Sequence, residues 1–183
     1  MPRHAEAVRG FTFIEAVIAL AIIGLLVAIA VPAWTNARAV VHSRAVRAAL
    51  LGSITEAIRH STTTGSEVVL CASVDGLACS GTPDWSEGWL AYADIDGNRE
   101  RAPRETLLRR QAALDGGVHL RSTRGRTRLV FQPNGGNAGS NVTFTLCDGR
   151  GRERAVTLVL ANNGRLRDGR PSRMAAEACV RGG

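Results

Sequence analysis

Apolar residues fill one segment near the start of the chain, residues 11–31 (FTFIEAVIALAIIGLLVAIAV). As an α-helix rising about 1.5 Å per residue, a segment of this length spans roughly 30 Å, the thickness of a bilayer core. Arg3 and Arg9 precede it, and basic residues favour retention of the start on the cytoplasmic side. The pattern therefore predicts one transmembrane helix. An ordinary signal peptide, cut near Ala30 or Ala33, is the alternative.

An amphipathic stretch follows, in which every fourth residue is apolar and the set shares one helix face. The set comprises Val46, Leu50, Ile54 and Ile58. Pro32 is expected to bend the helix without ending it, as proline does inside membrane helices. We therefore predict one helix from about Phe11 to His60, ended by the Ser/Thr cluster and glycine of residues 61–65.

Short β-signals occupy the rest of the chain, and Asp-Gly and Asn-Gly turns separate several of them. Strands are predicted over residues 67–71, 89–92, 128–131, 142–146 and 155–160. Short strands after one long helix predict an α+β fold, with a long N-terminal helix packed on a small antiparallel β-sheet head.

Length and charge say little about the class of protein, but the charge suggests a kind of partner. The 183 residues suit one modest domain plus an extension. Residues 1–98 hold 6 arginines against 9 carboxylates, whereas residues 99–183 hold 17 arginines against 7 carboxylates, and the chain has no lysine. A basic half of this size favours polyanions such as nucleic acid or acidic lipid headgroups. A well-solvated, arginine-rich surface explains the same numbers, so charge alone leaves both open.

The chain starts with a membrane-export pattern and contains four cysteines after it: Cys71, Cys79, Cys147 and Cys179. An even number in an exported chain predicts two disulfides in an oxidising compartment, with three possible connectivities. A zinc site is the less favoured alternative, because the chain has no CxxC-type pair and its histidines are scattered. We expect no metal.

Glu15 places a carboxylate inside the apolar segment, where an ionisable group is costly and usually functional. The segment Gly10-Phe11-Thr12-Phe13-Ile14-Glu15 resembles the prepilin peptidase site of type IV pilins and type II secretion pseudopilins. The resemblance implies that a prepilin peptidase cuts between Gly10 and Phe11, that Phe11 is N-methylated and that Glu15 acts in assembly. A buried carboxylate can pair there with the α-ammonium of a neighbouring subunit.

The head resembles the FimT/GspH family of minor pilins and pseudopilins over most of residues 10–180. Three stretches carry the likeness: Cys71 to Cys79, Asp84-Trp85-Ser86-Glu87-Gly88-Trp89, and Asp94-Ile95-Asp96-Gly97-Asn98. The resemblance implies a pilin fold, in which the long helix packs on two small antiparallel sheets. It also implies the disulfide pairings Cys71–Cys79 and Cys147–Cys179.

The resulting domain organisation has four segments. They are a prepilin leader (1–10), the transmembrane half of the helix (11–31), its amphipathic half (32–62) and a disulfide-bonded, β-rich head with a basic tail (63–183). The resemblance implies a single-pass inner-membrane protein with a periplasmic head, which later enters a pilus filament. Its implied partners are the prepilin peptidase, the inner membrane before assembly, and other major and minor pilins.

Catalytic signals are weak. No serine lies in a nucleophile-elbow context such as GxSxG. The acidic stretch of residues 94–98 lacks EF-hand spacing and a suitably placed glutamate, so a carboxylate-rich turn is favoured. Trp85 and Trp89 are expected to be core or hairpin aromatics and not a ligand platform. We therefore expect no enzymatic activity and no cofactor.

The C-terminal tail carries the clearest binding signal. Arg165 and Arg167 are one residue apart, so on an extended segment both side chains point the same way. Arg170 and Arg173 follow in a stretch where Asp168, Gly169 and Pro171 are expected to prevent regular structure. Guanidinium groups match phosphate oxygens, and a flexible tail can follow a DNA backbone.

Gly164-Arg165-Leu166-Arg167 resembles the GRxR motif of the FimT branch, which implies binding of double-stranded DNA during natural transformation. A second basic run comprises Arg121, Arg124, Arg126 and Arg128. This run either widens the DNA surface or is a solvated sheet edge. The leading hypothesis is thus a minor pilin that binds DNA without sequence preference. The alternatives are a pseudopilin or tip-assembly pilin without DNA binding, and a secreted enzyme.

Overall fold

The computed structural model describes residues 11–182 of the chain. It forms two compact units, one ending at Ala37 and one beginning at Arg38, and each is described by itself. Helix α1 (Phe13–Thr64) contributes to both units. Its apolar N-terminal part is exposed in the chain, and by length and composition it can cross a membrane, as the sequence predicts. The predicted leader, residues 1–10, lies outside the described residues.

Helix α1 ends later than the sequence pattern predicts. The hydroxyls of residues 62–64 donate hydrogen bonds to carbonyls three or four residues earlier in the helix, so this cluster continues the helix instead of breaking it. Gly65 follows with φ of 74°, a left-handed conformation that glycine adopts freely at helix ends. The predicted end at His60 is therefore wrong by about one turn. The helix continues through Pro32, as expected.

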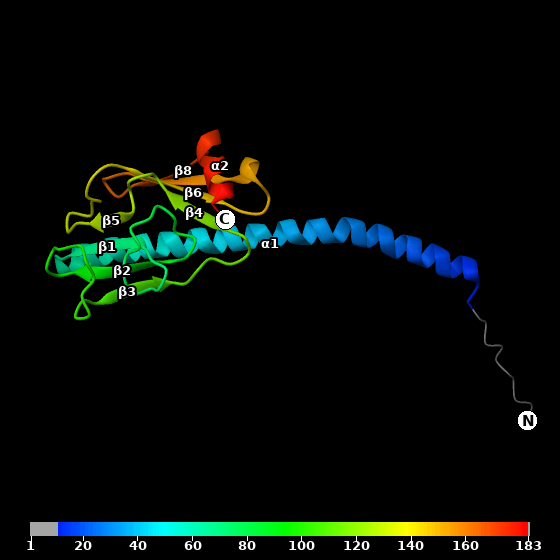
Figure 1. Cartoon of the computed structure of the whole chain (residues 1–183), viewed down its shortest axis with the longest axis horizontal. Coiled ribbons are helices and arrows are strands. Elements are labelled where there is room, and N and C mark those ends of the chain that lie inside the picture. Colours follow the sequence, from blue (N-terminus) through cyan, green and yellow to red (C-terminus); the bar gives the residue numbers. More distant parts are fainter. Residues whose placement is uncertain (1–10, 183) are drawn as a thin grey trace, which may run out of the picture. The chain divides into compact units, whose positions relative to one another are not determined.

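Two four-stranded antiparallel sheets form the head (Figure 1). The first has the order β3-β2-β1-β5 and comprises β1 (Glu67–Ala72), β2 (Trp89–Asp94), β3 (Leu107–Gln111) and β5 (Arg128–Phe131). The second has the order β4-β6-β7-β8 and comprises β4 (His119–Ser122), β6 (Val142–Cys147), β7 (Val156–Leu160) and β8 (Leu166–Gly169). A short 3-10 helix, η1 (Arg152–Arg154), precedes β7, and helix α2 (Arg173–Arg181) follows β8.

The five predicted strands are all present, with bounds that differ by at most two residues. The sequence analysis missed β3, β4, β8 and α2. Strand β3 is largely exposed and β8 carries arginine, aspartate and glycine, so neither shows apolar alternation. These strands exist because a neighbouring strand supplies their backbone hydrogen bonds.

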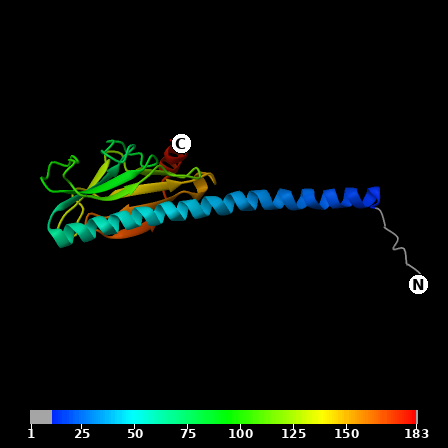
Figure 2. The same ribbon diagram turned by 90° about the horizontal axis from the view of Figure 1, so that it is seen from below.

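The core lies between residues 38–64 of α1 and the two sheets, along which this part of the helix runs (Figure 2). Leu50 and Ile54 are buried on the predicted apolar face. Trp85 and Trp89 are fully buried in the same cluster, which confirms their expected role. Their indole Nε1 groups donate to the hydroxyls of Ser122 and Ser53, at 3.1 and 2.9 Å, so their polar atoms are satisfied inside the core.

Both disulfides implied by the resemblance are present. Cys71–Cys79 covers the outer face of the first sheet beside Tyr92. Cys147–Cys179 joins the end of β6 to α2, and both cysteines are buried with Ala155 and Ala176. The second disulfide therefore holds α2 against the second sheet.

The long-range disulfide is expected to contribute more to stability than the local one. Its cysteines are 32 residues apart against 8 for the other pair. In the chain-entropy model, loops of these lengths give about 4 and about 2.5 kcal/mol. We therefore expect Cys147→Ala/Cys179→Ala to lower the free energy of unfolding more than Cys71→Ala/Cys79→Ala does. Chemical denaturation of the full chain in nonionic detergent measures both, and equal losses would contradict the prediction.

Candidate nucleic-acid interface

The predicted DNA-binding arginines lie on and next to a β-hairpin. Strands β7 and β8 pair with Val159 opposite Arg167. The backbone amide of Ala161 donates to the carbonyl of Arg165 at 2.9 Å and closes the hairpin end. The prediction that Asp168, Gly169 and Pro171 prevent regular structure is therefore wrong: β8 extends to Gly169 and α2 begins at Arg173. The missing signal was a partner strand, which no local pattern reveals.

Gly164 occupies a position that only glycine fits. Its φ is 79°, and a Cβ there would lie 2.8 Å from the carbonyl oxygen of Gly135. The next backbone amide, of Arg165, donates to the side-chain oxygen of Asn163 at 3.2 Å. Steric close approach thus accounts for the glycine of the GRxR motif, and the turn fixes where its first arginine emerges.

Arg165 and Arg167 are exposed, and within residues 11–182 neither guanidinium forms an ion pair with a carboxylate. The intervening Leu166 packs against the core, so strand alternation places Arg167 on the opposite face of the sheet. Asp168, in contrast, pairs with Arg47 of α1 at 2.8 Å. The carboxylate nearest in sequence is thus bound elsewhere and leaves both arginines free to bind an anion.

The outer face of the second sheet continues from Arg167 into a hollow of about 430 Å³ that Arg170 also lines. Three threonines of β6 and β7 line it as well: Thr143, Thr145 and Thr157. Thr145 and Thr157 are buried and Thr143 is partly buried, so the arginines are the main groups that this hollow presents to an anion.

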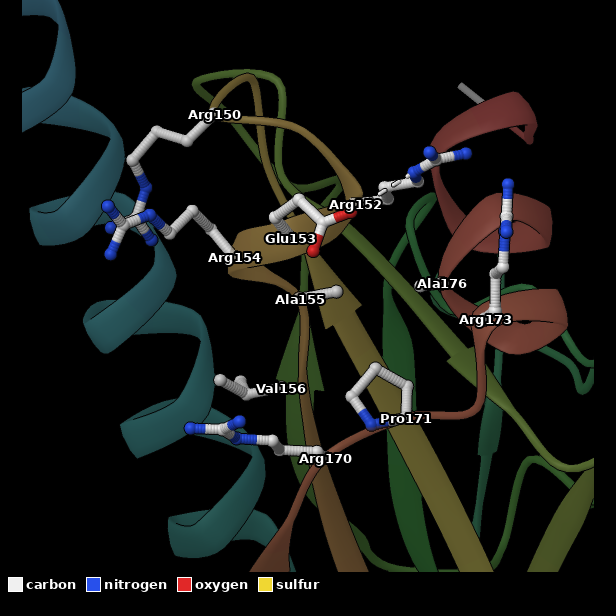
Figure 3. Close-up of a pocket in the computed structure, with 10 residues that line it drawn as sticks. All are labelled: Arg150, Arg152, Glu153, Arg154, Ala155, Val156, Arg170, Pro171, Arg173 and Ala176. Carbon is white, nitrogen blue, oxygen red and sulfur yellow. Dashed lines mark hydrogen bonds and ion pairs between the residues drawn. The ribbon is translucent and has the colours of Figure 1, made fainter.

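A second hollow, of about 680 Å³, brings Arg170 and Arg173 next to three arginines that the sequence analysis did not single out (Figure 3). These are Arg150, Arg152 and Arg154. The regular spacing of these three arginines was a visible signal, but only the fold places them beside the tail.

The second basic run lines neither hollow. Arg126 is half-buried, donates to the carbonyl of Ala138 at 3.1 Å, and has its pKa lowered by burial. Arg128 donates to the carbonyl of Arg99 at 2.9 Å. Arg124 is exposed between β4 and β5. Two of these three side chains thus link loops of the head, and the structure does not bring them to the tail arginines.

Asp148 organises the loop that leads to η1. Its buried carboxylate accepts hydrogen bonds from the Ser43 hydroxyl of α1 and from the guanidinium of Arg150, the latter at 2.6 Å. Burial by itself raises the pKa of this carboxyl, but the hydrogen bonds from Arg150 and Ser43 outweigh burial and lower the pKa below its usual value. The carboxylate therefore attaches the η1 loop to the helix.

Glu15 forms a capping box at the start of α1. Its carboxylate accepts from the backbone amide and the hydroxyl of Thr12, at 2.9 and 2.8 Å, and its own amide donates to that hydroxyl at 3.3 Å. The T-x-x-E spacing of Thr12 and Glu15 is the sequence signal for this capping box. Glu15 is exposed in this chain, so it is accessible to a neighbouring subunit.

One acidic cluster could hold a cation: Asp94, Asp96 and Glu105. Its carboxylates already have protein partners. Asp94 accepts from the amides of Gly97 and Arg99, and Glu105 accepts from the amides of Ile95 and Ala102. Asp96 pairs with Arg104 at 2.7 Å. The cluster therefore orders its own loop, in agreement with the predicted carboxylate-rich turn.

Two protein-family models match the chain. Residues 42–164 match the family described as type II transport protein GspH. Residues 7–31 match the prokaryotic N-terminal methylation motif. A comparison with curated protein sequences gave no match.

Solved structures with a similar fold include the type IV minor pilin FimU of Pseudomonas aeruginosa PAO1. In one crystal form it gives a TM-score of 0.51 at 14% identity, covering 72% of this chain and 88% of FimU. In another crystal form FimU gives a TM-score of 0.48 at 16% identity, covering 73% of this chain and 91% of FimU. The minor pseudopilin EpsH of the Vibrio cholerae type 2 secretion system gives 0.45 at 16% identity, covering 74% and 99%. The likeness to FimU confirms the predicted pilin fold.

Gly164→Ala is expected to destabilise the hairpin, because the new Cβ meets a backbone oxygen and the backbone remains left-handed. We expect a loss of about 2 kcal/mol in the free energy of unfolding. Gly149→Ala is the matched control, since no atom lies within 4 Å of its Cβ position and its φ is not positive. Equal stability of the two variants in thermal melts would refute this steric account.

The lowered pKa of Asp148 predicts a pH dependence of stability. Because the folded-state pKa lies below the unfolded value of about 3.9, the stabilisation is complete above that value and is lost as pH falls through the folded pKa. Asp148→Asn should therefore be less stable than the wild type at neutral pH, by about 1–3 kcal/mol. This difference should shrink below about pH 4. Urea denaturation across this range measures it, and a constant difference would count against the ionic role.

Proposed function

We propose, since this chain belongs to the family of the type II transport protein GspH, that it is a minor pilin whose head binds extracellular double-stranded DNA for uptake in natural transformation. The family and the N-terminal methylation motif support the pilin-like part of the proposal. The arrangement of the tail arginines supports the DNA-binding part.

One observation carries the proposal. Two exposed arginines lie at a hairpin whose turn requires Gly164, and neither has a carboxylate partner among the described residues. Arg165 and Arg167 present forked donors on a fixed backbone, so phosphate binding requires little ordering of the chain. Contacts to phosphates carry no base information, so we propose binding without sequence preference. The proposed role is binding, not catalysis.

The N-terminal half of the proposal concerns membrane insertion and assembly. The apolar part of α1 would anchor the precursor in the inner membrane, with the head in the periplasm. Cleavage by a prepilin peptidase between Gly10 and Phe11 would create the α-ammonium that is then methylated. Glu15 would pair with the Phe11 ammonium of a neighbouring pilin as the filament forms, so that each charge neutralises the other within an apolar bundle.

A second candidate function is supported by the family match itself: a type II secretion pseudopilin, or a minor pilin that acts only in assembly. In that case the head would bind other pilins, and its arginines would be solvated surface charge. DNA binding separates the two candidates.

Arg165→Gln/Arg167→Gln is expected to weaken DNA binding about tenfold or more and to lower the slope of log K against log salt by about 2. The measurement is a fluorescence anisotropy titration of the full chain in nonionic detergent. It uses a duplex of about 30 base pairs at about 50 and 200 mM salt. Arg99→Gln/Arg109→Gln is the matched control, because it removes two exposed arginines on the first-sheet side of the head, and neither has an ion pair among the described residues.

Tight, salt-sensitive binding by the wild type and the control, with loss in the tail variant, would support the DNA-uptake function. Failure of the wild type to bind at low salt would leave the assembly function. Equal losses in both double variants would mean that overall charge, and not the hairpin, binds the DNA.

A further inference from the structure

The hollow next to α2 gathers positive charge from two parts of the chain that are distant in sequence (Figure 3). Arg150, Arg152 and Arg154 come from the loop and short helix before β7. Arg170 comes from the segment that joins β8 to α2, and Arg173 is the first residue of α2. Five guanidinium groups surround about 680 Å³, with Glu153 as the one carboxylate among the lining residues.

These arginines are only partly neutralised. Within residues 11–182, Arg154 and Arg170 form no ion pair with a carboxylate. Arg150 pairs with the buried Asp148 at 2.6 Å. Arg152 pairs with Glu153 at 3.3 Å and with Glu177 at 2.8 Å, and Arg173 shares Glu177 at 3.1 Å. Three carboxylates therefore offset five arginines. The hollow therefore keeps an excess of positive charge, which attracts anions to this part of the surface.

The walls of the hollow are held in place by covalent and buried contacts. The Cys147–Cys179 disulfide fixes α2 to β6, and Ala176 packs beside Ala155 in the same buried cluster. The hydroxyl of Ser172 accepts from the amide of Ala175 at 3.2 Å and caps α2. Guanidinium groups on fixed walls bind an anion with a smaller loss of entropy than groups on a flexible tail.

The hollow adjoins the outer face of the second sheet. Arg170 and Pro171 line both this hollow and the threonine-lined one that contains Arg167. We infer that the arginine hollow is a second phosphodiester-binding site, which holds the backbone of the same duplex that Arg165 and Arg167 contact. This inference rests on the proposed function and adds residues of η1 and its loop to the interface.

The two sites are close along β7. Arg154 is the last residue of η1, and β7 begins two residues later at Val156. Val159, opposite Arg167, is the fourth residue of this strand, so at about 3.4 Å per residue it lies about 10 Å from the start of β7. Each strand of DNA carries a phosphate about every 3.4 Å, so one duplex is long enough to reach both ends of this short strand.

Arg152→Gln/Arg154→Gln tests the second site without touching the GRxR motif. We expect binding to the duplex of about 30 base pairs to weaken about tenfold, with the salt slope reduced by about 2. The full chain in nonionic detergent is titrated as for the tail variant, and Arg99→Gln/Arg109→Gln again serves as the matched control. Thermal melts confirm that each variant is folded.

Glu153→Gln provides a test that misfolding cannot imitate, because the expected change is a gain. The Glu153 side chain is 86% exposed, and its carboxylate pairs with Nε of Arg152 at 3.3 Å. Arg152 stays paired with Glu177, but removal of the Glu153 charge makes the hollow more positive by one unit, so we expect binding to strengthen about two- to threefold. Glu100→Gln, an exposed carboxylate on the first-sheet side of the head, is the control. At about 0.1 M salt, a charge more than about 10 Å from the duplex is screened.

Three outcomes separate this inference from the proposed function. Loss in Arg152→Gln/Arg154→Gln together with gain in Glu153→Gln would support the second site. If the tail variant loses binding while both hollow variants match their controls, the second site is wrong and the proposed function stands. If the wild type does not bind the duplex, both fail.

Discussion

The buried face of α1 is the constraint on which the rest of the head depends. Leu50, Ile54 and Ala57 lie in one cluster with core residues of both sheets. Each sheet has four strands and an apolar inner face that needs cover, and the helix face provides that cover for both. Burying an aliphatic side chain of this size contributes about 1.5–3 kcal/mol, so a polar substitution on this face would weaken the packing of both sheets.

The position of the basic surface follows from this packing. The hairpin of β7 and β8 is the outer part of the second sheet, and Asp168 ties it to Arg47 of α1. The loop before η1 is tied to the same helix through Asp148 and Ser43. Two sets of arginines that are separate in the sequence are thus attached to one rigid support. Their mutual distance is set by the sheet and not by the flexibility of a tail.

The same arrangement explains how a pilin-like chain can carry a binding function. The core tryptophans satisfy their polar atoms internally, and the acidic loop around Asp94 orders itself through its own backbone. The arginines are different, because several have no carboxylate partner among the described residues, and the structural elements beneath them hold them in place. The binding that we propose at this surface would depend on charge and spacing, whereas the fold depends on the helix and the core.

The sequence by itself determined the class of the protein. Local signals were sufficient for the apolar helix, its buried face and five strands, because periodicity and composition report burial directly. Family resemblance added the disulfide pairings. Tertiary structure decided the rest. Residues 166–169 form strand β8 because β7 supplies their backbone hydrogen bonds. The arginines between β6 and β7 line the same hollow as Arg170 because the sheet places β7 beside β8. Such contacts join residues far apart in the chain, and no local pattern encodes them.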